Sequence, residues 1–202
     1  HMINAGFGRL ADRENLVLIA PGGGDASIDL GNIQGKLWDK RGDIEELKGI
    51  WDFMRGELCL DPTQVFAVGD VSGGQAVERL PCEWPITAMA TNGYNASSQD
   101  TRCEHQQAVP YLQLLFTQDQ YNPRRGGRNV TGGEKRSWDE GVERWQKFNS
   151  CNDNRRVERS KHGSCAYYTC EAPFVQCRIE GGRPWPGTAP PPWELVHGLR
   201  GG

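Results

Sequence analysis

The segment Gly69–Gln75, with the sequence GDVSGGQ, combines a serine with glycines in a spacing that could support nucleophilic chemistry. It follows the apolar run VFAV and precedes a helical pattern, so it predicts a strand, a sharp turn and a helix. In a nucleophile elbow, a serine between two glycines lies at such a turn and exposes its hydroxyl. Counted from Gly69, the serine's position holds Val71. Shifted by one residue, the position holds Ser72.

The two alignments of this turn predict opposite chemistry. Valine has no hydroxyl, and its branched side chain disfavours the positive-φ backbone of an elbow. The shifted alignment supplies Ser72 as the nucleophile, but it puts Asp70 where a very small residue normally lets strand and helix pack closely. A third interpretation of Ser72 is an ordinary helix N-cap, a role that serine performs well.

Alternating strands and helices must position this turn. The helical composition of GRLADREN precedes the first predicted strand, and capped helices are expected to begin at Asp43 and Ser137. This alternation predicts an α/β fold with a mostly parallel sheet and helices on both faces. One domain is expected over residues 3–202, ending in a Pro-rich irregular tail at 183–202. Strands are predicted at 16–21, 64–70, 86–91, 109–116 and 174–180.

The composition excludes several classes of partner. The chain has 202 residues, a net charge of −3 and a pI near 5.8, and no basic stripe with interleaved aromatic residues, so nucleic acid is not an expected partner. No apolar run approaches the length of a membrane span. The seven cysteines contain no CxxC pair and the histidines are scattered, so neither a zinc site nor another cofactor is predicted.

The cysteines and two sequons indicate an oxidising compartment. Seven cysteines favour two or three disulfides with one thiol left over. The tripeptides NAS at Asn95 and NVT at Asn129 are compatible with a secreted glycoprotein. We therefore expect a secreted, extracellular protein.

Five segments, in order and spread over nearly the whole chain, carry a family resemblance. They resemble the secreted α/β-hydrolase esterases that include polyhydroxybutyrate depolymerases and feruloyl or acetylxylan esterases, carbohydrate esterase family 1. The segments are GFGRLADRENLVLIAP, LDPTQVFAVGDVSGGQAVERLPCEWP, VPYLQLLFTQDQ, SWDEGVERWQKFNSC and IEGGRPWPG. The second is similar to the family's elbow, usually Gly-x-Ser-x-Gly-Gly. The last is similar to its Glu-Gly-Gly-Gly-His-x-Trp-Pro-Gly.

The resemblance implies a serine, an acid and a histidine, and this chain departs from the pattern at two of them. A gapless match over residues 65–85 puts Val71 in the nucleophile's position. Asp119 matches the acid, although an aspartate just past a strand end is also a common turn residue. The last segment has no histidine and is one residue shorter than the family pattern, with Arg183 and Pro184 near the missing histidine. Only His197 would preserve the chain order after Ser72 and Asp119.

The resemblance also implies missing strands and particular disulfides. The family's first three strands, one of which delivers half of the oxyanion hole, have no counterpart here. The remaining strands would close up, or a partner chain would complete the sheet, or the missing strands would belong to sequence that this chain does not include. Cys151 is expected to pair with Cys170 or Cys165, and Cys82 with Cys103.

Three functions are compatible with these observations. The first is a catalytically impaired esterase relative that binds an ester-bearing or polysaccharide ligand, with Trp185 and Trp193 as stacking residues. The second is an active serine esterase that uses Ser72, Asp119 and His197. The third is a fragment that needs a partner chain, a second copy of itself, or its own missing amino-terminal half to complete its sheet.

Overall fold

The computed structural model describes residues 7–21, 27–29, 34–36, 41–95, 108–130 and 132–182. It divides into two compact units, His1–Gly22 with Arg183–Gly202, and Gly23–Gly182. The single domain over 3–202 stays a prediction, and the Pro-rich tail at 183–202 lies outside the described residues. The second unit contains the sheet and the helices that position the elbow.

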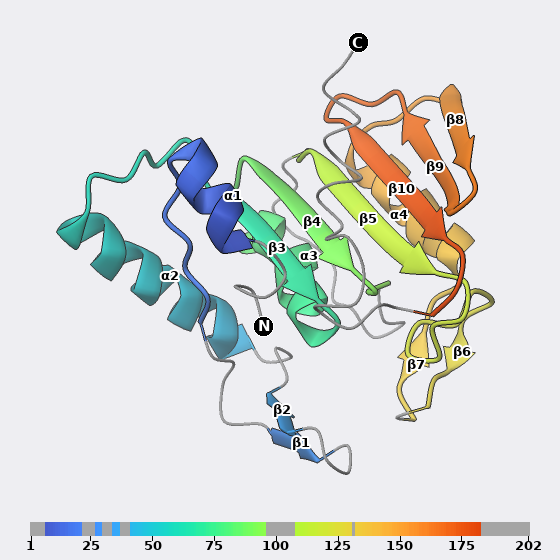
Figure 1. The fold of residues 1–202 in the computed structure, drawn as a ribbon, viewed down its shortest axis with the longest axis horizontal. Coiled ribbons are helices and arrows are strands. Elements are labelled where there is room, and N and C mark those ends of the chain that lie inside the picture. Colours follow the sequence, from blue (N-terminus) through green and yellow to red (C-terminus); the bar gives the residue numbers. More distant parts are fainter. Residues whose placement is uncertain are drawn as a thin grey trace. The chain divides into compact units, whose positions relative to one another are not determined.

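A mixed, mostly parallel sheet of six strands organises this unit (Figure 1). Its order is β3-β4-β5-β10-β9-β8. The first four strands run parallel, β9 runs antiparallel to β10, and β8 runs antiparallel to β9. The α/β prediction is confirmed at this level, as are the predicted strands near residues 64–70, 86–91, 109–116 and 174–180. The strands are β3 (Phe66–Asp70), β4 (Ala88–Asn92), β5 (Tyr111–Phe116), β8 (Arg155–Ser160), β9 (Gly163–Tyr168) and β10 (Phe174–Ile179).

The described residues contain four helices. α1 (Phe7–Glu14) belongs to the first unit, and α2 (Arg41–Glu57), α3 (Ser72–Glu83) and α4 (Trp138–Phe148) belong to the second. The predicted cap of α4 is confirmed, because the Ser137 side chain accepts from the Glu140 N–H and the Glu140 carboxylate accepts from the Ser137 N–H. The predicted cap of α2 is wrong. That helix begins at Arg41, which puts Asp43 inside its first turn.

The main core lies on one face of the sheet. Register aligns Met89, Tyr111, Phe174 and Tyr168 across four strands, and Trp145 of α4 packs on the Tyr111 ring with centroids 4.6 Å apart. Residues of α3 and α4 share this cluster, and α2 contributes Ile44 and packs against α3. α3 and α4 both cover this face, and the expectation of helices on both faces stays a prediction.

The strand predicted at residues 16–21 does not form. Leu16, Val17 and Leu18 are 43%, 50% and 37% exposed, and none of the described strands pairs with this segment. Its apolar composition indicated burial, but a strand also requires a neighbour for its backbone groups.

Three antiparallel pairs were not anticipated. The β8–β9 hairpin extends the main sheet, whereas β1 (Ser27–Asp29) with β2 (Gln34–Lys36), and β6 (Gly127–Arg128) with β7 (Glu134–Lys135), form separate small sheets. All six residues of β8 are exposed, so neither of its faces shows the apolar alternation by which strands are recognised.

Two disulfides lie in the described part of the chain. Cys151 pairs with Cys170, which confirms one of the two predicted alternatives, and Cys165 pairs with Cys177 across β9 and β10. Cys82 is also disulfide-bonded, and Cys103, its predicted partner, lies outside the described residues. Cys59 is free and exposed.

Candidate functional site

The turn between β3 and α3 has the backbone of an elbow. Val71 adopts φ 52° and ψ −110°, a conformation that a β-branched residue strongly disfavours. Its N–H donates to the Asn92 carbonyl at 3.1 Å, and its own carbonyl accepts from the Gly74 N–H at 3.0 Å. These bonds hold the strained residue between the end of the strand and the first turn of the helix.

Glycine spacing allows the strand and the helix to approach closely at this turn. A Cβ added at Gly69 would lie 2.3 Å from the Gly73 carbonyl oxygen, and one at Gly74 would lie 2.4 Å from the Tyr94 Cβ. The close approach therefore falls at Gly69. Asp70, the corresponding residue of the shifted alignment, is exposed and accepts from the Asn92 Nδ2 at 2.9 Å.

Ser72, the nucleophile of the shifted alignment, is the first residue of α3. Its backbone follows Val71 directly, and the structure does not describe its side chain. The residue that carries the strained elbow conformation is therefore Val71, one position earlier.

Asp119 lies three residues beyond β5 and is buried. Its Oδ1 accepts from the Tyr121 N–H at 2.8 Å, and its Oδ2 accepts from the Asn122 Nδ2 at 3.3 Å. Its own N–H donates to the Phe116 carbonyl. Both carboxylate oxygens thus stabilise the local loop, as in an Asx-turn. Asp119 and Val71 share the carboxyl edge of the parallel strands, where open α/β sheets bind ligands.

The three other predicted site residues lie outside the described ranges: His197, Trp185 and Trp193. His162 is the one histidine that the described residues contain, in the turn between β8 and β9. Five strand spacings separate β8 from β3, which is roughly 24 Å. His162 is therefore too distant to serve the elbow.

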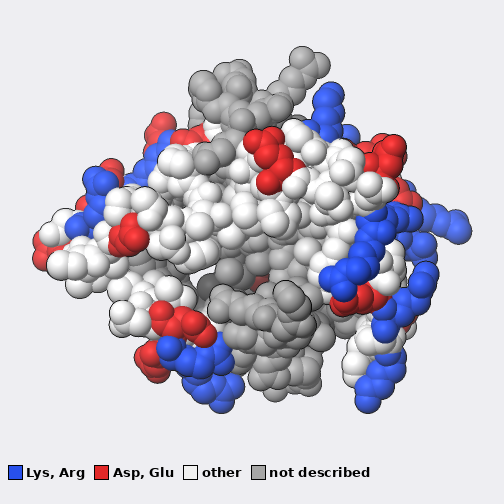
Figure 2. Space-filling model, turned by 90° about the horizontal axis from the view of Figure 1, so that it is seen from above, with Lys and Arg blue, Asp and Glu red and all other residues white. Residues whose placement is uncertain are grey.

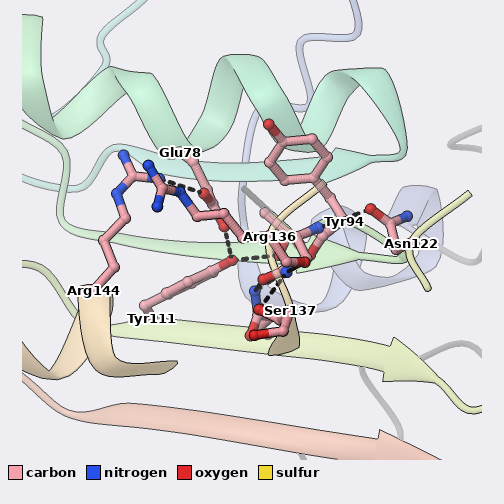
Figure 3. A network of polar contacts seen from close by, with 10 residues as sticks. Glu78, Tyr94, Tyr111, Asn122, Arg136, Ser137 and Arg144 are labelled. Atoms are coloured by element: carbon pink, nitrogen blue, oxygen red, sulfur yellow. Dashed lines mark hydrogen bonds and ion pairs between the residues drawn. The ribbon is translucent and has the colours of Figure 1, made fainter. Parts of the chain in front are cut away.

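Sequence reasoning missed a buried polar cluster behind the elbow helix (Figure 3). Glu78 of α3 is 3% exposed and accepts from the Tyr111 hydroxyl at 2.6 Å, while Arg144 of α4 lies 3.5 Å from its second oxygen. The same hydroxyl contacts the Thr91 hydroxyl at 2.6 Å. Burial, followed by the negative charge of Glu78, raises the pKa of Tyr111 well above its ordinary value. This cluster anchors α3 to the sheet and to α4.

The sequence did contain a signal for this cluster. Glu78 lies between the buried Val77 and Leu80 on the inward side of α3, where an acidic residue is rarely found without a partner. A buried carboxylate there requires donors from neighbouring elements, but periodicity does not say which residues supply them.

A chain of buried amides runs beside the cluster. The Asn95 Nδ2 donates to the Arg136 and Ser137 carbonyls, and the Asn95 N–H donates to the Asn122 Oδ1. Asn95 is fully buried, so this fold has no room for the glycan that its sequon predicted. The Asn129 amide, in the other sequon, donates to the Tyr121 carbonyl.

No described helix is long and apolar enough to cross a membrane. Within the described ranges, no three His, Cys, Asp or Glu side chains gather as they would around a metal ion. The sequence matches no protein-family model and no curated protein. The functional argument therefore rests on the elbow and on the residues around it.

Proposed function

We propose that this protein is a divergent, catalytically impaired relative of the secreted carboxylic ester hydrolases, and that it binds an ester-bearing or polysaccharide ligand. The observation that carries the proposal is Val71, which has the backbone conformation of an elbow residue but no hydroxyl. The close approach at Gly69 supports the alignment that gives Val71 this position. Loss of the nucleophile alone typically lowers the rate by several orders of magnitude.

The surroundings of the elbow support the same proposal. Both oxygens of the Asp119 carboxylate accept hydrogen bonds from its own loop, and the one described histidine lies at the far end of the sheet. The two disulfides are compatible with an oxidising compartment, and we propose secretion on that basis.

Hydrolysis of p-nitrophenyl acetate tests the impaired-enzyme part of the proposal. We expect the wild-type protein and Ser72→Ala to show the same slow rate, close to that of the buffer. A rate well above buffer that is lost in Ser72→Ala would instead support the active esterase that uses Ser72, Asp119 and His197.

Affinity electrophoresis in gels containing soluble xylan tests the binding part. We expect the wild-type protein to be retarded, and a variant with Trp185→Ala and Trp193→Ala to migrate as in a gel without xylan. Trp51→Ala is the matched control, because Trp51 packs on Trp84 between α2 and α3. Equal retardation of both variants would contradict a role for Trp185 and Trp193.

A second candidate function, completion of the sheet by another chain, is favoured by one observation. β3 is an edge strand of the sheet, and its Phe66 and Val68 side chains are 52% and 39% exposed. Size-exclusion chromatography with light scattering tests this candidate. A dimer or larger assembly that Val68→Lys dissociates would support it, and a monomer with a cooperative melt would contradict it.

A further inference from the structure

The edge strand β8 is built differently from the rest of the sheet. Among the described strands it pairs only with β9, and all six of its residues, RRVERS, are exposed. Lys and Arg side chains gather on the side of the molecule that carries β8 and β9 (Figure 2). An edge strand presents a row of backbone donors and acceptors with no partner in its own sheet.

The hairpin register shows which backbone groups point away from β9. Ser160 and Gly163 pair across a two-residue turn, and the Thr169 N–H donates to the Asn154 carbonyl. In an antiparallel pair, hydrogen-bonded residues alternate with residues whose N–H and C=O point outward. The outward positions are therefore Arg155, Val157 and Arg159.

Side chains at these same three positions share one face, because side chains alternate along a strand. Arg156, on the opposite face, forms an ion pair with Glu158 and stacks on the Tyr167 ring at 4.5 Å. Neither Arg155 nor Arg159 has an ion pair within the described part of the chain. Two free cations, about 13 Å apart along the strand, thus flank Val157, which is 37% exposed.

We infer that β8 binds an extended acidic peptide segment as an added strand. Main-chain hydrogen bonds to the outward groups supply the pairing, and side chains at alternate positions supply the specificity. The complementary segment has carboxylates opposite Arg155 and Arg159 and an apolar residue opposite Val157. Charged edges normally repel unwanted strands, and an acidic segment is the one that this edge attracts. The inference stands on β8 alone and is independent of the elbow.

Fluorescence anisotropy with a labelled peptide containing Glu-Thr-Val-Thr-Glu tests this inference. We expect saturable binding to the wild-type protein. Binding should weaken about tenfold or more in Arg155→Glu with Arg159→Glu, and also in Val157→Pro, which removes one outward donor without breaking a bond to β9. The matched charge control is Lys147→Glu, an exposed change on α4 that should leave the affinity unchanged.

A second peptide keeps the test decisive even where a variant folds poorly. The same sequence with alternate amides N-methylated retains every charge but cannot pair along one edge, and we expect it not to bind wild-type protein. Binding of the methylated peptide as tightly as the parent would overturn the inference. So would absence of parent binding, or a Val157→Pro protein that melts and binds like wild type.

Discussion

At one end of the sheet, β4 is the one described strand that pairs with β3, and Phe66 and Val68 of β3 are exposed. At the other end, β8 pairs with β9, carries charged side chains on both faces, and adjoins the Cys165–Cys177 disulfide. The charged side chains of β8 are stable in contact with water. Exposed apolar side chains such as those of β3 are typical of a surface that another protein segment covers. We call the β8 end the hairpin end and the β3 end the elbow end.

The comparison also separates two ways of fixing a backbone. The hairpin end is held by cross-links, which limit the unfolded chain. The elbow end is held by glycine contacts that admit no side chain and by a valine in a strained conformation. Strain that persists is commonly found where a backbone conformation has served a function. This strain supports the proposal that the elbow end retains the geometry of a catalytic site without its reactive group.

The largest effect is expected from removing the Cys151–Cys170 disulfide, whose cysteines are 19 residues apart. Replacing both with alanine should lower the free energy of unfolding by about 3 kcal/mol, because the unfolded chain regains loop entropy. Urea denaturation measures this, with Cys59→Ala as the control, since Cys59 is free and exposed. A loss below about 1 kcal/mol would show that the hairpin end does not depend on cross-linking.

Gly69→Ala should have the next largest effect, about 2 kcal/mol of destabilisation, because the added Cβ meets the backbone of α3. Gly73→Ala is the matched control. A Cβ there meets nothing within 4 Å, and alanine favours the helix. Urea midpoints that shift equally in the two variants would contradict the close approach of strand and helix at Gly69.

Tyr111→Phe should cost about 1.5 kcal/mol at neutral pH, because it removes the hydroxyl that donates to Glu78. The variant should also change how stability depends on pH in the alkaline range. Burial raises the pKa of Tyr111 in the folded protein, so its stabilising contribution is complete below the ordinary tyrosine pKa of 10.0 and is lost as pH rises above it. Thermal melts between neutral and alkaline pH should therefore fall less steeply for Tyr111→Phe than for wild type. Melting temperatures that fall equally with pH in both proteins would exclude ionisation of Tyr111 as a cause of the loss of stability at alkaline pH.

Val71→Gly should have the smallest effect and the opposite sign. Glycine adopts positive φ without strain, so the elbow should gain about 1 kcal/mol. Val68→Gly is the control within the same strand region, and it should destabilise because glycine weakens a strand. Chemical denaturation would contradict the strained elbow if both variants lost stability equally.

Local spacing predicted the strand, sharp turn and helix around Gly69–Gln75, because the close approach of Gly69 to Gly73 involves residues near in sequence. The same is true of the Ser137 cap, which needs only Glu140 three residues later. Leu16–Leu18 were predicted wrongly as a strand, because composition reports burial tendency and not the presence of a neighbouring strand. β8 was not predicted, because the sequence of an edge strand that is exposed on both faces does not alternate between apolar and polar residues.

Long-range pairings account for the rest of what was missed. Cys165 meets Cys177 only because β9 and β10 pair in one particular register. Glu78 contacts Tyr111 of β5 and Arg144 of α4, which are distant in sequence and are brought together by the fold. A local pattern could mark each residue as unusual, but it could not identify the partner.

Covalent labelling with a fluorophosphonate, mapped by mass spectrometry, tests the central claim most directly. Such probes form an adduct only with an activated serine, and the account assigns the elbow position to Val71. We predict no adduct on any serine of the folded protein, in a mixture where an active serine hydrolase is fully labelled. An adduct on Ser72 that disappears in Ser72→Ala would contradict the account.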